Sequence, residues 1–344
     1  MDNSLPLSSK VNDIPFLNTS PTQEFPKEST HHIIFVVHGI GSCKESLENK
    51  EKRFRKILDK VLIEKKEMFS DSVELKMLDW KSYLIEEAGN QIDQITLKNH
   101  KKKRHLLNTF PADILFYLSH KHNHNILLQI VRQANEHYEK IVSTRKEGNI
   151  AVHFLAHSLG GVITYDLLNK NYQLSLNDNT ISKKLKLNFE VQQVFLLGSP
   201  ISLFLTINEE KKIVPLDQKE FIKGLYNIFH PHDLIAYRLE FLIEGYECDL
   251  EPMFVKCYKK NGFKNHKKIK KNSLWDFCFC RGEERKWKEG ERKRYDYELQ
   301  ESWLEHWVEV LGVLRGHDCY WENEDVAYFM IRKMGEEKIG RVLD

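Results

Sequence analysis

Cysteine is scarce in this chain, and the few cysteines form no recognisable pattern. Six cysteines are scattered over 344 residues, and only Cys278 and Cys280 lie close together. No pair has the spacing of a zinc finger, which argues against a structural zinc domain and a disulfide-stapled scaffold. We therefore expect a reduced, cytoplasmic protein.

Long apolar runs are also missing. No stretch approaches the roughly 18 residues that a membrane span requires. Residues 1–30 lack the apolar core of a signal peptide. Charge of one sign is not in excess either, because the formal net charge is +2. We therefore expect no membrane span and no nucleic-acid partner.

The length of 344 residues suits one large α/β domain or two small ones. A chain of this size buries a core without disulfides or metals. Residues 1–29 carry four prolines among Ser, Thr and Asn, which predicts a disordered arm. We assign residues 30–344 to a single domain.

The most informative stretch is Ala151–Val162, AVHFLAHSLGGV. An apolar run of strand length is followed by a turn of small residues around Ser158, and then by a helical pattern. Strand, tight turn with a central Ser and helix is typical of the nucleophile elbow of α/β-hydrolases. Ala156 stands where the usual Gly-x-Ser-x-Gly pattern has its first Gly. The alternative interpretation is a buried turn serine without chemistry.

A second turn could complete such a site. The buried run His31–Val37 ends in His38-Gly39-Ile40-Gly41. In lipase-like hydrolases the backbone after such a His-Gly pair supplies one oxyanion donor. We predict the N–H groups of Leu159 and of Ile40 or Gly41 as the oxyanion hole. A glycine-rich turn without chemistry is the alternative.

The remaining pattern predicts a mostly parallel sheet with helices on both faces, of the α/β-hydrolase type. Further strands are expected over residues 73–78, 190–197 and 225–230, and amphipathic helices over residues 45–69 and 126–144. We expect residues 169–188 to form a polar loop. His120, His122 and His124 alternate among Lys and Asn, which favours a polar linker over a metal site.

Two later residues have the chain order that this fold requires. Asp233 follows the strand at 225–230, and His317 lies in a later loop. The hydrolase order is Ser, acid, His. We therefore predict Ser158, Asp233 and His317 as the catalytic triad, in which the imidazole takes the proton from the Ser hydroxyl.

A basic segment lies between Asp233 and His317. Residues 256–271 hold eight lysines and no acidic residue, and aromatic residues follow. Lysines beside aromatic rings suit an anionic membrane surface. The predicted contacts are Lys267, Lys268, Lys270, Lys271 and Trp275. A solvated surface insertion, over about residues 256–294, is the alternative.

Several stretches together resemble one known family, the DDHD-domain intracellular phospholipases A1 that prefer phosphatidic acid. The resemblance rests on FVVHGIG at 35–41, DILFYLS at 113–119, HSLGGVITYDLL at 157–168, VFLLGSPISLFL at 194–205, NIFHPHDLIAYRLEFLI at 227–243, RYDYELQE at 294–301 and HDCYWENED at 317–325. It implies a DDHD-type region over about residues 186–340. The four residues that name the domain fall on Asp233, Asp296, His317 and Asp325.

The resemblance implies hydrolysis of the sn-1 acyl ester of a glycerophospholipid at intracellular membranes, without a cofactor. Asp296 and Asp325 would then organise the loops around the triad. Alternatively, Asp233, Asp296, His317 and Asp325 could hold a divalent cation. A broader esterase, a triacylglycerol lipase and a catalytically silent lipid-binding module are the other functions to separate.

Overall fold

The computed structural model describes residues 29–40, 44–89, 94–95, 97, 99, 112–145, 148–210, 212–246, 250–259, 293–300 and 317–340. Seven strands form one sheet in the order β2-β1-β3-β4-β5-β7-β6, and every pair of neighbours is parallel. The α/β-hydrolase-like, parallel architecture predicted from the sequence is therefore confirmed.

The strands pair in regular register except between β3 and β4, where the register shifts between Val152 and His153. They are β1 Thr30–Val37, β2 Ser72–Leu78, β3 Asn149–His157, β4 Val191–Leu197, β5 Gly224–Phe229, β6 Met253–Phe254 and β7 Asp296–Glu298. Buried strands of this kind read as continuous apolar runs because both faces of a parallel sheet are covered. That is why β1, β3, β4 and β5 could be predicted from the sequence, whereas β2 was predicted from its alternating pattern.

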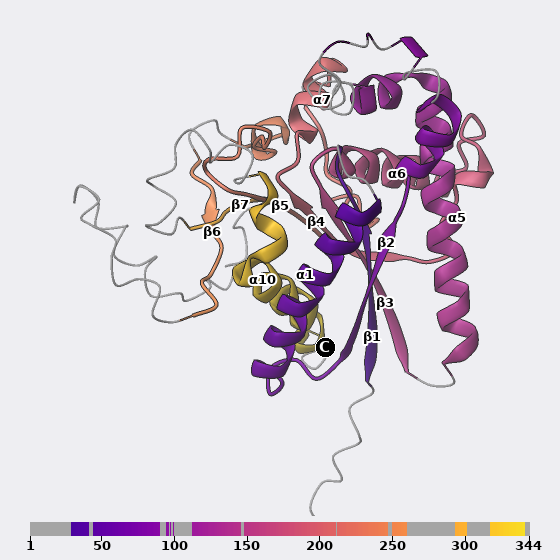
Figure 1. Cartoon of the computed structure of the whole chain (residues 1–344). Coiled ribbons are helices and arrows are strands. Elements are labelled where there is room, and N and C mark those ends of the chain that lie inside the picture. The colour runs from indigo at the N-terminus through magenta and orange to yellow at the C-terminus, as the bar shows by residue number, and fades with distance from the viewer. Residues whose placement is uncertain are drawn as a thin grey trace, which may run out of the picture.

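Helices cover both faces of the sheet (Figure 1). The longer helices are α1 Lys44–Glu64, α5 His120–Thr144, α6 Leu159–Ser175 and α10 Glu324–Gly340. Shorter elements are α2 Lys81–Leu84, the π-helix η1 Ile85–Gly89, α7 Ile201–Ile207, the 3₁₀ turns η2 Lys183–Leu185, η3 Glu240–Leu242 and η6 Cys319–Glu322, and a helix at 112–118. Among the helices described, none is both long and apolar enough to cross a membrane.

Alternate side chains of β1 enter two separate cores. Phe35 packs in the core that contains residues of α5 and α6, whereas Val36 packs in the core that contains residues of α1 and α10. This alternation follows from the two-residue period of a strand. The two apolar clusters sandwich the sheet and fix the positions of the loops at its carboxyl edge.

Two local predictions were wrong. The stretch that includes His120, His122 and His124 opens α5, where Ser119 caps the helix by accepting a hydrogen bond from the His122 N–H at 3.5 Å. The polar stretch after residue 169 continues as α6 as far as Ser175. Both segments are polar because one side of the helix faces solvent, a pattern that also suits a loop.

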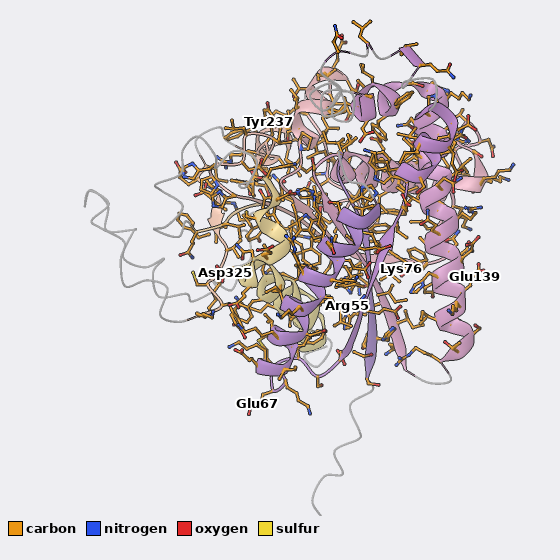
Figure 2. The ribbon with its side chains drawn as sticks, in the orientation of Figure 1. Arg55, Glu67, Lys76, Glu139, Tyr237 and Asp325 are labelled. Carbon is orange, nitrogen blue, oxygen red and sulfur yellow. The ribbon has the colours of Figure 1, made fainter. Side chains whose placement is uncertain are left out.

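The two ends of the sheet carry different elements. α6 begins at the carboxyl end of β3, and α7 begins at the carboxyl end of β4 (Figure 1). Figure 2 shows Tyr237, which follows β5, at this same end, and Glu67, which follows α1, at the opposite end. In open α/β sheets, ligands bind in the crevice beyond the carboxyl ends of the strands.

Candidate active site

Ser158 occupies a strained turn between β3 and α6. Its backbone has φ 56° and ψ −128°, a conformation that is rare for a residue with a side chain. The turn leaves little room around it: a Cβ added to Gly39 would lie 2.6 Å from the Ser158 Cβ, and one added to Gly160 would lie 2.2 Å from the Val37 carbonyl oxygen. The glycines that flank the turn are required by these close approaches. Ala156 fits in the strand before it, fully buried.

His317 lies beside this turn. The His157 and His317 rings have centroids 4.7 Å apart, and the His157 Nε2 lies 2.7 Å from the His317 carbonyl oxygen. Only a donor can bond to a carbonyl, so the Nε2 of His157 carries the proton. Burial lowers the pKa of His157 well below its usual value, which keeps this ring neutral. The residue next to Ser158 therefore holds the backbone of His317.

Asp233 binds the other side of the His317 ring. Both carboxylate oxygens of Asp233 lie 3.0 Å from His317 Nδ1. The Ile235 N–H donates to Asp233 Oδ1 at 2.9 Å, and the Tyr320 hydroxyl donates to Oδ2 at 2.7 Å. Burial favours the protonated acid, but the hydrogen bonds from His317 and Tyr320 outweigh it and lower the pKa of Asp233. The carboxylate fixes the proton on Nδ1 and leaves Nε2 of His317 as the basic atom.

The absence of a side chain at Gly198 leaves room for the Asp233 carboxylate. Gly198 follows β4 with φ 54°, and a Cβ there would lie 2.4 Å from Asp233 Oδ2. The Ser158 N–H donates to the carbonyl of Leu197, the residue before Gly198. Ser158 follows β3 and Asp233 follows β5, so both lie at the carboxyl edge of the sheet. There Asp233 binds His317, whose ring lies beside that of His157, the residue before Ser158.

The two turns predicted to supply oxyanion donors face each other. Leu159 opens α6, and the first N–H groups of a helix have no partner within the helix. The chain after β1 is fixed by His38, whose ring stacks on Trp80 at 5.0 Å and whose carbonyl accepts from Trp80 Nε1 at 3.0 Å. Ile40 follows, partly buried against the core. Gly41 lies outside the described residues.

Asp296 lies at a separate place. It is fully buried at the start of β7 and accepts hydrogen bonds from Arg238 Nε at 3.1 Å, the Leu239 N–H at 2.9 Å and Asn227 Nδ2 at 2.9 Å. Burial raises the pKa of this carboxyl. These contacts tie the chain that follows Asp233 to β7.

Asp325 occupies a third position. It lies in the first turn of α10, where it accepts a hydrogen bond from the Tyr258 N–H at 2.6 Å, and burial raises its pKa. In the described ranges, no group of three or more His, Cys, Asp and Glu is arranged to hold a metal ion. The structure brings Asp233 and His317 together and leaves Asp296 and Asp325 elsewhere.

Tyr320 is the residue that sequence reasoning missed. Its hydroxyl accepts from the His230 N–H at 2.9 Å and donates to Asp233, so it joins the acid to the segment that carries His317. It is fully buried. A tyrosine shortly after a candidate catalytic His was the only available signal, and nothing in the sequence indicated its partner.

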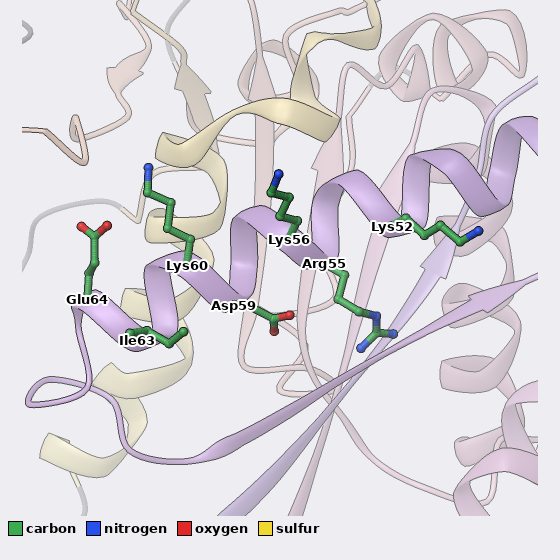
Figure 3. Close-up of a pocket in the computed structure, with 7 residues that line it drawn as sticks. All are labelled: Lys52, Arg55, Lys56, Asp59, Lys60, Ile63 and Glu64. Carbon is green, nitrogen blue, oxygen red and sulfur yellow. The ribbon is translucent and has the colours of Figure 1, made fainter.

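Some predicted residues cannot be placed. Lys267, Lys268, Lys270, Lys271 and Trp275 lie outside the described residues, as does most of the basic segment. A surface hollow of about 510 Å³ is described on the exposed side of α1 (Figure 3). It contains none of the site residues, and two of its four basic side chains, Arg55 and Lys60, pair with Glu51 and Glu324. We assign it no part in the chemistry.

Comparison with known proteins now bears on this site. Residues 187–276 and 280–335 match the DDHD domain. This part of the chain is therefore similar to the DDHD domain. Asp233, Asp296, His317 and Asp325 all fall within the matched residues, whereas Ser158 precedes them.

Relatives extend the similarity beyond the DDHD domain. The chain is 26% identical to Phospholipase DDHD1 of Mus musculus over 313 residues, which cover 74% of this chain and 56% of the mouse protein. It is 26% identical to Intracellular phospholipase A1 of Caenorhabditis elegans over 259 residues, 61% of this chain and 30% of the worm protein. Triacylglycerol hydrolase DDHD2 of Mus musculus is 26% identical over 206 residues, 43% of this chain and 29% of that protein. The chain therefore spans about half or less of the length of these relatives.

Proposed function

We propose that this chain is a serine hydrolase that cleaves acyl esters of glycerophospholipids. The observation that carries the proposal is the Asp233–His317 pair, with oxygens 3.0 Å from Nδ1, beside the positive-φ turn of Ser158. The names of the relatives that include the word phospholipase support the substrate class.

The chemistry requires only residues of this chain. His317 Nε2 takes the proton of the Ser158 hydroxyl while the oxygen attacks the ester carbon, and the carbonyl electrons move onto its oxygen. The N–H of Leu159 and of Ile40 or Gly41 would stabilise that oxyanion. Collapse expels the lysolipid alcohol, which takes the proton from His317. Water then repeats the cycle and releases the fatty acid.

The finer specificity is also proposed. We infer cleavage at the sn-1 position, with phosphatidic acid as the preferred lipid, because the motifs resemble that phospholipase A1 group and one relative bears the name phospholipase A1. Asp296 and Asp325 act as supporting residues for the loops, given their buried hydrogen bonds. No metal is needed for this chemistry, so we expect activity that is insensitive to EDTA.

The decisive experiment compares wild type with Ser158→Ala on a panel of phosphatidic acid, phosphatidylcholine and triacylglycerol. Wild type should release fatty acid and react with a fluorophosphonate probe. Ser158→Ala should lose at least about three orders of magnitude in turnover and remain folded. Near-normal turnover by the folded variant would refute the serine mechanism, and loss of wild-type activity in EDTA would favour the metal alternative.

A triacylglycerol lipase is the second candidate. It is favoured by one observation, the similarity to a protein named triacylglycerol hydrolase. The same panel separates the two candidates, because a phospholipase should prefer the charged lipid. A chain that hydrolyses neither lipid and does not label would instead be a silent lipid-binding module.

We also propose that the basic segment docks the enzyme, as a cytoplasmic protein, on anionic intracellular membranes. Each lysine near such a surface contributes about 1 kcal/mol, less at higher salt. Replacement of Lys267, Lys268, Lys270 and Lys271 by Gln should weaken binding to phosphatidic-acid vesicles at low salt, with little effect on a soluble ester. Unchanged vesicle binding would reduce the segment to a solvated insertion.

A further inference from the structure

A cavity of about 240 Å³ lies between the helix at 112–118, the start of α5, α6 and α7. Its apolar walls come from Val162 of α6 and from Ile201, Phe204 and Leu205 of α7. Leu118 stands at its rim with 54% of its surface exposed. We propose that this cavity binds the acyl chain of the ester substrate, an inference that rests on the proposed function.

Ser158 itself does not line the cavity, but the two helical walls begin close to it. α6 starts at Leu159, directly after Ser158, so Val162 lies one helical turn beyond the serine. α7 starts at Ile201, four residues after Leu197, whose carbonyl accepts the Ser158 N–H at 2.9 Å. A Cβ on Gly161 would lie 2.2 Å from Ser199 Oγ, which shows how closely the two starts approach.

The lining of this cavity does not favour a phosphate head group. Among the described residues that line it, none is Lys or Arg, and Asp166 contributes a carboxyl group. An anionic head group would therefore find no Lys or Arg of the lining to pair with. An acyl chain requires only apolar contact, which the α7 residues and Val162 provide.

The cavity also has polar lining residues, which are Tyr117, His120, Asn123, Tyr165, Asp166 and Asn208. Asp166 lies two helical turns beyond Ser158, about 12 Å along the axis of α6. It accepts a hydrogen bond from the Tyr117 hydroxyl, and burial raises its pKa.

The test uses the ratio of kcat/KM for p-nitrophenyl palmitate to that for p-nitrophenyl butyrate. Val162→Phe fills the cavity and should lower this ratio at least about tenfold, as loss of apolar contact with several methylenes implies. Phe204→Ala enlarges the cavity and should also change this ratio, because it alters kcat/KM for the palmitate ester and leaves that for the butyrate ester nearly unchanged. Leu203→Ala is the matched control, because Leu203 is the exposed neighbour of Phe204 on α7 and does not line the cavity.

A binding measurement keeps this proposal separate from the hydrolase proposal. Ser158→Ala protein should bind a fluorescent long-chain fatty acid, and the added Val162→Phe change should weaken that binding about tenfold. Fluorophosphonate labelling of the single variants reports an intact fold. Unchanged ratios and unchanged fatty-acid binding in labelled variants would overturn the acyl-chain assignment. Failure of wild type to hydrolyse any ester, with fatty-acid binding intact, would refute the hydrolase and retain the cavity.

Discussion

Tyr320 bonds to two parts of the site with one hydroxyl. It accepts from the His230 N–H and donates to the Asp233 carboxylate, so the acid is held from the same segment that carries His317. Its burial raises the pKa of the phenol well above the usual value, which keeps the proton available for donation. The orientation of Asp233 therefore depends on Tyr320 as well as on its own loop.

Tyr320→Phe should weaken both the fold and the site. The change leaves the buried His230 N–H without its acceptor, and we expect a loss of about 1–3 kcal/mol in the free energy of unfolding. Turnover of a soluble ester should fall about tenfold, the loss expected if one hydrogen bond to a charged group is removed. Urea unfolding and steady-state kinetics measure the two effects. Tyr328→Phe is the control, because the Tyr328 ring packs on Tyr258 rather than on Asp233; equal effects of both variants would contradict the assignment.

His157 acts on His317 through the backbone. Its neutral ring donates from Nε2 to the His317 carbonyl at 2.7 Å and lies among His317, Tyr320 and Trp321. Because His157 directly precedes Ser158, this hydrogen bond couples the position of the nucleophile to that of the base. We therefore expect His157 to be a positioning residue.

His157→Phe should lower kcat about tenfold with KM nearly unchanged, since it keeps an aromatic ring but removes the donor to a buried carbonyl. His157→Gln retains an amide N–H at a similar reach and should recover part of the rate. The measurement is kcat and KM on a soluble ester, with fluorophosphonate labelling rates as a second readout. Equal kcat for the two variants would mean that the ring fills space and that its hydrogen bond is unimportant.

Elements differ in how much of their position the sequence reveals. β1, β3, β4 and β5 are buried on both faces, and their apolar runs predicted them. β6 and β7 are only two and three residues long, and they pair through contacts far apart in the chain. Local patterns carry no such information, so neither strand was predicted.

The candidate site divides in the same way. The turn at Ser158 was predictable because adjacent small residues encode it. The pairing of Asp233 with His317 was expected from chain order, with Asp233 after a strand and His317 in a later loop. Tyr320 and His157 act through contacts across space, and no local spacing indicates them. The positions of Asp296 and Asp325 could not be predicted either, because residues that belong to one family motif need not lie in one site.

α1 fixes the segment around His317 mainly by packing. Phe54 of α1 is buried, with its ring edge toward Trp321 at 6.1 Å between centroids. α1 also forms ion pairs with this segment, Lys50 with Asp318 at 2.9 Å and Arg53 with Glu322 at 2.7 Å. The Arg53 and Glu322 side chains are each 61% exposed, so water screens their attraction.

We therefore expect Phe54→Ala to cost about 3–5 kcal/mol of unfolding free energy, and Arg53→Gln to cost less than about 1 kcal/mol. Phe54→Ala should also slow ester turnover, because the segment that carries His317 loses its support. Denaturant titration and kinetics on both variants provide the comparison. If Arg53→Gln lost more unfolding free energy than Phe54→Ala, the ion pairs of α1 rather than its packing would hold the segment around His317.

Protons destabilise the whole molecule through histidines that the fold buries in neutral form. Burial is the main cause, and it lowers the pKa of His38 to about 4 despite the hydrogen bond to the Gly39 carbonyl, which favours the charged ring. Burial likewise lowers the pKa of His153 and His157 well below the usual value. The folded chain thus binds fewer protons than the unfolded chain in mild acid.

The direction of the pH effect follows for His38. Its pKa is about 6.5 when unfolded and about 4 when folded. The contribution of neutral His38 to the unfolding free energy is fully present above about pH 6.5. It is lost as the pH falls toward 4, a decrease of roughly 3 kcal/mol. His38→Asn keeps a donor toward Gly39 but does not titrate, so its unfolding free energy should fall less steeply over this range. Urea titrations at several pH values measure the unfolding free energy of both proteins. An equally steep fall with decreasing pH in wild type and His38→Asn would contradict this prediction.

The boundary between β3 and β4 separates the candidate nucleophile from the candidate acid and base. Ser158 follows β3, before the DDHD match begins, whereas Asp233 and His317 both lie within that match. Under the proposed function, cleavage between α6 and η2 yields two fragments, one with the nucleophile and one with the acid and base. Each should be inert alone, and pairing of β3 with β4 should restore turnover. Hydrolysis of a chromogenic ester would then measure how far the two fragments have associated.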